Sequence, residues 1–127
     1  SIQWTGDILC DPDSLAQEVA SMLRATNNGV AYCNADCGGH IGDPDKEVFL
    51  RWMQFGTLSP VFRPHCTNIV ERNRDPWAYD EETLRIVREY NKLRYGASRS
   101  SRRSGGTIRP IKRRSGVPTN ICSAATF

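Results

Sequence analysis

Residues 30–39 read Val-Ala-Tyr-Cys-Asn-Ala-Asp-Cys-Gly-Gly, a short run with apolar character that ends in small residues and two glycines. Val30–Asn34 has the length and composition of a buried strand in a parallel sheet. The small residues that follow are typical of the loop that leaves such a strand. Helical patterns stand on both sides of this stretch, which indicates an α/β fold with a parallel sheet.

Working outward, three helix patterns alternate with three short strand patterns. The first helix is predicted after Asp11-Pro12-Asp13-Ser14, which supplies capping groups, and it should end at Asn27-Asn28-Gly29. A second helix is expected from residue 46 until Gly56 stops it, and a third from residue 80 onward. Ser1–Trp4 and Leu58–Phe62 are the other predicted strands. This alternation fits either a β/α barrel or an open doubly wound sheet.

Polar side chains follow the ends of the predicted strands, where barrel enzymes place their chemistry. Asp7 follows Trp4, and an aromatic wall beside a carboxylate suits sugar binding with general acid catalysis. Asp36 follows the second strand, and Arg63 and His65, which follow the third, can donate hydrogen bonds to hydroxyls. The alternative is that both aspartates cap turns and that Trp4 belongs to the core.

The five cysteines are an odd number without the regular spacing of a disulfide framework, and we expect mostly free thiols. They are Cys10, Cys33, Cys37, Cys66 and Cys122. Cys33, Cys37 and His40 could be half of a zinc site, but no convincing second pair follows. Cys66 beside His65 is a weak nucleophile pair, since neighbours in sequence rarely align for that chemistry. We therefore expect no metal, and no organic cofactor.

Charge divides the chain into two unlike parts. Residues 1–95 carry 10 Lys and Arg against 14 Asp and Glu, whereas residues 96–127 carry seven Lys and Arg and no acidic residue. A basic tail allows an alternative function, a small α/β binding module that holds nucleic acid through the tail. Because residues 1–95 are mildly acidic and the tail lacks interleaved aromatics, nucleic acid is not the expected partner. No apolar run is long enough to cross a bilayer.

The segment Trp4-Thr5-Gly6-Asp7 is followed, between Asp36 and Tyr95, by five short sequence motifs in a recognisable order. They are Asp36-Cys37-Gly38-Gly39-His40, residues 47–56, residues 59–65, Arg74-Asp75-Pro76-Trp77 and Leu93-Arg94-Tyr95. Together they resemble glycoside hydrolase family 31, the family of α-glucosidases and α-xylosidases. The resemblance covers residues 1–95. It implies a partial (β/α)8 TIM barrel, about its last three βα units, and enzymatic hydrolysis of the O-glycosidic bonds of α-glucosides or α-xylosides in carbohydrate metabolism.

The resemblance also implies roles for individual residues. Asp7 matches the family's catalytic acid/base, and His65 matches a histidine that holds hydroxyls of the sugar. Asp36 and Arg63 match polar residues of the same pocket, and Trp4 would flank it. The family's second carboxylate, the nucleophile of a retaining mechanism, lies about 5 Å from the acid/base and comes from an earlier strand that this sequence lacks.

We therefore expect a fragment, inactive alone, of an enzyme that acts on α-linked oligosaccharides or glycosides. At 127 residues the chain is about half of a whole barrel, so unpaired edges should promote self-association. His40 stands where many family members have Phe. From residue 96 the sequence leaves the family pattern, and we expect a low-complexity tail that is disordered or translated out of frame. A continuous reading frame in the source DNA, with no better match in the shifted frame, would exclude the second explanation.

Overall fold

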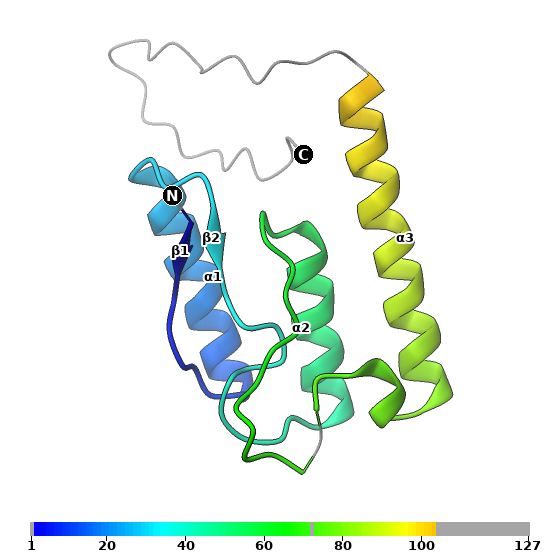
Figure 1. Ribbon diagram of the computed structural model, residues 1–127. Coiled ribbons are helices and arrows are strands. Elements are labelled where there is room, and N and C mark those ends of the chain that lie inside the picture. Colours follow the sequence, from blue (N-terminus) through cyan, green and yellow to red (C-terminus); the bar gives the residue numbers. More distant parts are fainter. Residues whose placement is uncertain (1, 72, 104–127) are drawn as a thin grey trace, which may run out of the picture.

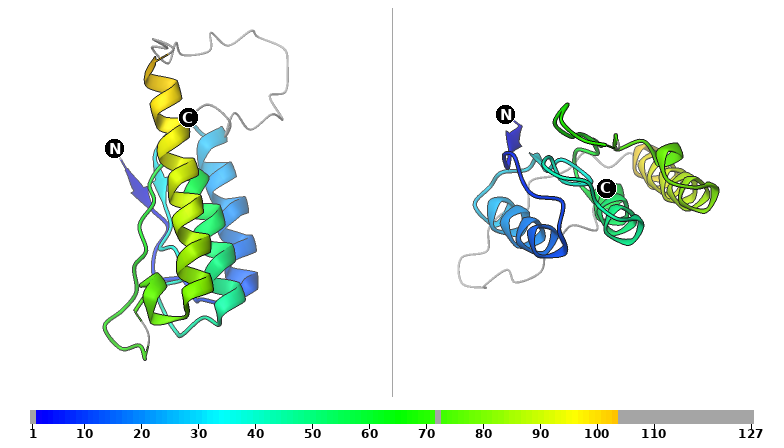
Figure 2. Two further views of the ribbon diagram at one scale, coloured as in Figure 1. Left: turned by 90° about the vertical axis from the view of Figure 1, so that its right-hand side faces the viewer. Right: turned by 90° about the horizontal axis from the view of Figure 1, so that it is seen from below.

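A computed structural model describes residues 2–71 and 73–103 as a layer of short strands and loops lying against a row of three helices (Figure 1). The elements in chain order are β1 (Gln3–Trp4), α1 (Pro12–Asn27), β2 (Cys33–Asn34), α2 (Lys46–Leu58), the 3-10 helix η1 (Pro76–Ala78) and α3 (Glu81–Arg103). Figure 2 shows the helices side by side with the strands on one side of the row. The three predicted helices are present, together with two of the three predicted strands.

The two strands are parallel, with Gln3 opposite Cys33 and Trp4 opposite Asn34. The amide of Thr5 continues the pairing by donating to the carbonyl of Asn34 at 3.0 Å. Beyond the strands, single parallel bridges join Leu9 to Ile41 and Cys37 to Pro64. The predicted parallel sheet is thus present, but each regular strand is only two residues long.

The helices begin where the sequence predicts because their capping groups are local. The carboxylate of Asp11 accepts a hydrogen bond from the amide of Ser14 at 2.8 Å, and this bond holds the pKa of Asp11 below its usual value. Asp45 caps α2 in the same way through the amide of Val48, at 2.8 Å. Helix α1 ends at the predicted Asn28 and Gly29, where Gly29 has a φ of 89°.

The core lies between the strand layer and the helices, in two clusters of buried side chains. One contains Met22, Cys33, Ala35 and Trp52, and the other contains Cys37, Phe49, Met53 and Val87. Alternate residues of the β2 segment, at 33, 35 and 37, therefore face the helices. Because side chains alternate along a strand, Asn34 and Asp36 point to the opposite face.

The strand predicted at Leu58–Phe62 is wrong, because helix α2 continues through Leu58 and the chain rejoins the sheet only at Pro64. Pro60 has no backbone N–H with which to donate a hydrogen bond to a neighbouring strand. The free carbonyls at the end of α2 are instead bound by Arg94 of α3, whose Nη1 donates to Thr57 and Ser59, each at 2.8 Å. A long-range side chain thus ends this helix, and no local signal reveals it.

Helix α3 continues past the boundary at residue 95 and ends at Arg103. Residues 104–127 lie outside the described residues, so the nature of the tail remains a prediction. None of the helices in the described ranges is both long and apolar enough to span a membrane.

Gly56 does not stop α2 as predicted, because the helix continues to Leu58. The glycine instead packs where no side chain fits. A Cβ at this position would lie 2.4 Å from Cys37 Sγ and 2.7 Å from Phe62 Cδ2. We predict that Gly56→Ala lowers the free energy of unfolding by about 1 to 3 kcal/mol, although Ala is the better helix former.

Gly96→Ala in α3 is the matched control, since a Cβ there meets no atom within 4 Å. It should stabilise the chain by up to about 1 kcal/mol. Urea denaturation of both variants measures the two effects, and a stabilising Gly56→Ala would contradict the packing explanation.

Candidate active site

The buried carboxylate of Asp36 is the centre of the site. Its side chain is fully buried, just beyond β2. Oδ1 accepts hydrogen bonds from Arg63 Nη2 at 2.7 Å and from Trp4 Nε1 at 3.2 Å. The structure thus brings together three of the predicted site residues, which come from three separate segments of the chain.

Asp7 lies in the turn after β1, and its side chain is 56% exposed. Its Oδ1 lies 3.5 Å from Nε2 of His40, whose Nδ1 lies 2.9 Å from Asp36 Oδ2. The imidazole of His40 therefore stands between the buried carboxylate and the exposed one. Asp7 has the solvent access that a general acid or base needs to reach a substrate.

His65 lies at the same end of the sheet, next to His40. The two imidazole centroids are 5.2 Å apart, and the ring of Trp4 lies 6.3 Å from that of His40 on another side. Four of the five predicted site residues therefore lie beside His40, and the fifth, Arg63, is joined to it through Asp36. His40 itself was not among the residues predicted for the site. The sequence marks His40 only as a possible zinc ligand beside Cys33 and Cys37 and as a departure from the family pattern.

A metal ion could draw on one cluster in this region. Asp36, His40 and His65 offer ligand atoms within 4.8 Å of one another, the one such group in the described part of the chain. Asp36 already binds His40, Arg63 and Trp4, and a guanidinium beside the carboxylate disfavours a cation there. We therefore interpret the cluster as a hydrogen-bonded network.

Backbone hydrogen bonds join the loop that carries Asp36 and His40 to the segment after Asp7. The amides of His40 and Ile41 donate to the carbonyl of Ile8, at 2.8 and 2.9 Å. Gly39 makes this approach possible, since a Cβ there would lie 2.3 Å from the Cα of Cys10 and its φ is 76°. The position of Asp7 relative to His40 is therefore fixed by the backbone.

Arg74 supports the same loop through its guanidinium. This side chain is buried, and its Nε and Nη2 donate to the carbonyl of Gly39 at 3.0 and 2.9 Å, while Nη2 also donates to the carbonyl of Gly42. The sequence places Arg74 in one of the family-like blocks without indicating a role. Its role is structural: it holds the turn between Gly39 and Gly42.

The cysteines in the described residues are free thiols, as predicted, and Cys122 lies outside those residues. Burial raises the pKa of Cys37 to about 12 and also raises that of Cys33. Neither thiol belongs to the group of candidate metal ligands, so the zinc half-site suggested by their spacing is not assembled among the described residues. The buried cysteines act as small core residues.

Glu18 lies on the buried face of α1, near Thr5 and Asp36. It is 6% exposed, and its Oε2 has no hydrogen-bond partner. Burial, together with the nearby negative charge of Asp36, raises the pKa of this carboxyl, although the Thr5 hydroxyl beside it acts in the opposite sense. Nothing in the sequence singles out Glu18, since helical spacing alone gives no reason to expect a buried carboxyl.

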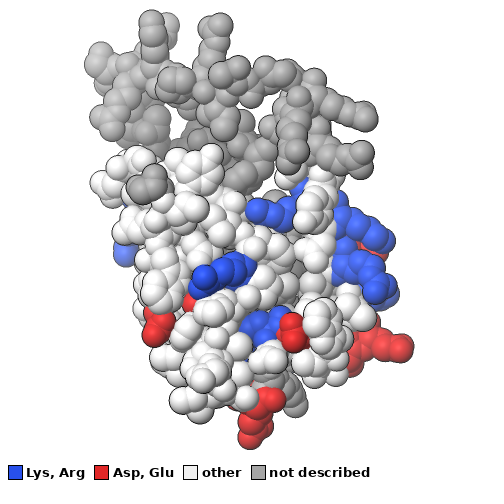
Figure 3. Space-filling view, in the orientation of Figure 1, with Lys and Arg blue, Asp and Glu red and all other residues white. Residues whose placement is uncertain are grey.

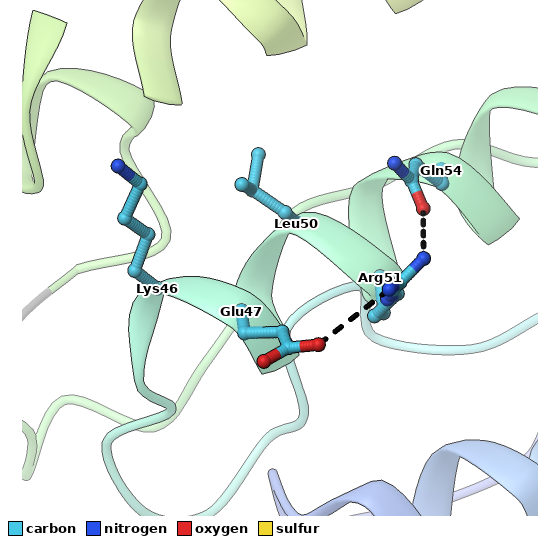
Figure 4. Close-up of a pocket in the computed structure, with 5 residues that line it drawn as sticks. All are labelled: Lys46, Glu47, Leu50, Arg51 and Gln54. Atoms are coloured by element: carbon cyan, nitrogen blue, oxygen red, sulfur yellow. Dashed lines mark hydrogen bonds and ion pairs between the residues drawn. The ribbon is translucent and has the colours of Figure 1, made fainter. Parts of the chain in front are cut away.

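A hollow on the outer surface of α2 is unrelated to this network. Lys46, Glu47, Leu50, Arg51 and Gln54 line it, all from one helix (Figure 4). Arg51 bridges Glu47 and Gln54 at 3.5 Å, with the Glu47 and Arg51 side chains largely exposed. Such contacts are typical of a solvated helix face.

Fold and site together define part of a β/α barrel enzyme, with polar side chains gathered where parallel strands end. The chain belongs to glycoside hydrolase family 31, because the family's TIM-barrel domain matches residues 1–97.

Known relatives agree with this assignment. Neutral alpha-glucosidase C of Homo sapiens is 40% identical over 93 residues, which cover 73% of this chain and 10% of that protein. Alpha-glucosidase 2 of Bacillus thermoamyloliquefaciens is 38% identical, over 72% of this chain and 12% of that protein. This chain thus spans about a tenth of the length of these relatives.

Solved structures show the same fold. A crystal structure of the glucosidase II alpha subunit bound to alpha3-Glc2 superposes with a TM-score of 0.70 and 34% identity, over 74% of this chain and 10% of that one. A xylosidase from Aspergillus niger gives a TM-score of 0.66 and 30% identity, over 80% of this chain and 17% of that one. The described elements are therefore a partial family 31 barrel.

The buried carboxyl of Glu18 predicts a pH-dependent stability. Because the pKa is raised in the folded state, this carboxyl stabilises the fold below its unfolded pKa, and the contribution is lost as pH rises through the folded pKa. We predict that Glu18→Gln is more stable than the wild type at pH 7, by roughly 1 kcal/mol, and that the difference shrinks towards pH 4.

Glu47→Gln serves as the control, because the Glu47 side chain is 80% exposed. It should change the free energy of unfolding by no more than a few tenths of a kcal/mol at either pH. Urea denaturation at pH 4 and pH 7 gives both differences. An equal effect of Glu18→Gln at the two pH values would rule out the burial explanation.

Proposed function

We propose that residues 1–95 form about the last three βα units of a retaining α-glycosidase barrel and supply its catalytic acid/base, Asp7. The observation that carries the proposal is the position of Asp7: an exposed carboxylate in the turn after a parallel strand, within a family 31 domain. Its neighbours Trp4, Asp36, Arg63 and His65 are the kind of groups that bind a sugar.

In this mechanism Asp7 acts twice. It first protonates the glycosidic oxygen of the leaving group, and it later takes a proton from the water that releases the sugar from the enzyme. The side chain beside the carboxylate of Asp7 is the imidazole of His40, whereas Arg63 pairs with Asp36, so the carboxyl of Asp7 stays open to a substrate. Exposure and geometry both support this role.

The remaining site residues would bind the sugar. His65 is exposed, lies beside His40, and can donate hydrogen bonds to sugar hydroxyls. Trp4 is 47% exposed, which suits stacking of its indole on a sugar ring. Arg63 is half exposed, so one end of its guanidinium binds Asp36 while the other can meet a substrate. Asp36 is fully buried and would act by orienting Arg63 and Trp4.

A retaining mechanism also needs a nucleophilic carboxylate about 5 Å from the acid/base. Asp36 cannot take that part, because it is buried and already accepts bonds from Trp4, Arg63 and His40. The nucleophile would come from a segment outside these 127 residues. We therefore propose that the isolated chain does not hydrolyse glycosides.

The substrate class follows from the relatives. They include enzymes named as alpha-glucosidases, a glucosidase II alpha subunit bound to alpha3-Glc2, and a xylosidase. We propose that the whole enzyme acts on α-linked glucosides or xylosides.

The strand face of the chain would be covered by the rest of the barrel. Figure 3 shows that much of this face is uncharged over the strands, while Lys and Arg gather towards α3. Ile2, Trp4 and Tyr32 are exposed there, at 66%, 47% and 52%. Since β1 pairs only with β2 in the described residues, we propose that the isolated chain self-associates through this face.

The function can be tested by restoring a whole barrel. Residues 1–97 replace the matching segment of human neutral alpha-glucosidase C, and hydrolysis of an aryl α-glucoside is measured. We predict that Asp7→Asn lowers kcat/KM, which reports formation of the glycosyl-enzyme, by roughly 10² to 10⁴-fold, because proton transfer to the leaving group is lost. The loss should be much smaller with α-glucosyl fluoride, whose leaving group needs little protonation.

Asp13→Asn is the matched control, since Asp13 is an exposed carboxylate in the first turn of α1. It should leave kcat/KM unchanged. Equal losses on both substrates in Asp7→Asn, or hydrolysis by the isolated 127-residue chain that depends on Asp7, would contradict the proposal.

A further inference from the structure

We infer that His40, which is hydrogen-bonded to Asp36, is a positioning residue that orients the carboxyl of Asp7 by a close contact of its other ring nitrogen. This inference rests on the proposed role of Asp7 as acid/base. His40 lies between the carboxylates of Asp7 and Asp36 and contacts both. It is neither the nucleophile nor one of the residues proposed to bind the sugar.

The bridge between Asp36 and Asp7 uses both nitrogens of one imidazole ring. Nδ1 lies 2.9 Å from Asp36 Oδ2, and Nε2 lies 3.5 Å from Asp7 Oδ1. The His40 side chain is only 15% exposed, whereas that of Asp7 is 56% exposed. The ring therefore joins a carboxylate with no access to water to one that faces it.

The partners of Asp36 determine where the protons lie. Its Oδ1 is occupied by the N–H donors of Arg63 and Trp4, so Oδ2 is the oxygen that faces His40. A buried carboxylate oxygen needs a donor, and Nδ1 is the group in position to provide one. His40 thus carries its proton on Nδ1, and Nε2 is left to face Asp7.

The contact between Nε2 and Asp7 is attractive only when a proton lies between them. Two bare lone pairs at 3.5 Å would repel, whereas an N–H on His40 or an O–H on Asp7 draws the two groups together. Either arrangement favours one orientation of the carboxyl of Asp7. A carboxyl held in one orientation loses less freedom when it meets the substrate.

The surroundings keep the imidazole itself from turning. The amide of His40 donates to the carbonyl of Ile8 at 2.8 Å, and its carbonyl accepts from the amide of Thr67 at 2.9 Å. The ring lies edge-on to Trp4, at 6.3 Å and 65°, and beside His65. The backbone bonds fix the main chain of His40, and the bond to Asp36 and the two neighbouring rings restrict its imidazole, which can then orient a more mobile side chain.

NMR on the full 127-residue chain tests the bridge directly. The chain has only two histidines, so ¹⁵N-histidine labelling gives few ring signals, and His65→Gln assigns them. We expect His40 to carry a proton on Nδ1, as judged from its ring ¹⁵N shifts. We also expect Asp7 to populate one dominant χ1 rotamer, as judged from three-bond couplings.

Three substitutions at residue 40 separate the two halves of the bridge. The amide of His40→Gln reaches the position of Nε2, the amide of His40→Asn reaches that of Nδ1, and His40→Phe keeps a ring without a donor. We predict that Asp7 becomes averaged in His40→Asn and His40→Phe, which have no group at the position of Nε2. We predict partial averaging in His40→Gln, which keeps that group but loses the bond to Asp36. Unchanged chemical shifts of Phe49 and Val87 show that the core is intact.

Several results would overturn the proposal. Asp7 could be averaged in the wild type, or it could keep one rotamer in all three variants. Zn²⁺ could shift both histidine rings and release Asp7, which would make the cluster a metal site instead. The wild-type measurement decides alone if a variant fails to fold. Because no activity is measured, failure here is distinct from failure of Asp7→Asn in the restored enzyme.

Discussion

The site depends on one buried carboxylate. Asp36 is fully enclosed and accepts hydrogen bonds from Trp4, His40 and Arg63. An unpaired charge in such a place would be strongly destabilising, so these donors are a requirement of the fold as well as of the site. Through them, the end of β1, the loop after β2 and the chain that returns from α2 are held at fixed distances.

The other long-range bonds serve the same purpose, because the strands are too short to organise the layer alone. Each regular strand has two residues. Arg74 holds the turn after Asp36, and Arg94 binds the carbonyls that end α2. In both cases an arginine from a later segment binds backbone oxygens of an earlier one. The geometry of Asp7 is thus set by side chains that lie far from it in sequence.

The parts of the structure that follow from local chemistry could be predicted from the sequence. Asp11 and Asp45 start helices through bonds to amides three residues ahead, and the apolar run at 30–34 gives a parallel strand. The end of α2 could not be predicted, because it depends on Arg94 and on the tight packing of Gly56. His40 and Glu18 could not be predicted for the same reason, since their importance comes from neighbours distant in sequence. The gathering of the candidate residues could be predicted only in part: Asp7 and Asp36 follow short parallel strands, whereas Arg63 and His65 follow no regular strand, and their roles stay predictions.

The most direct test of the central position of Asp36 is the free energy of unfolding of Asp36→Asn, measured in urea against Asp13→Asn, an exposed change of the same kind. Removing the charge leaves Arg63 without its partner and places an amide beside His40. We predict a loss of about 2 kcal/mol, less than for a wholly buried pair because Arg63 is half exposed. A loss below about 0.5 kcal/mol, no larger than a surface substitution causes, would contradict the view that Asp36 holds the site together.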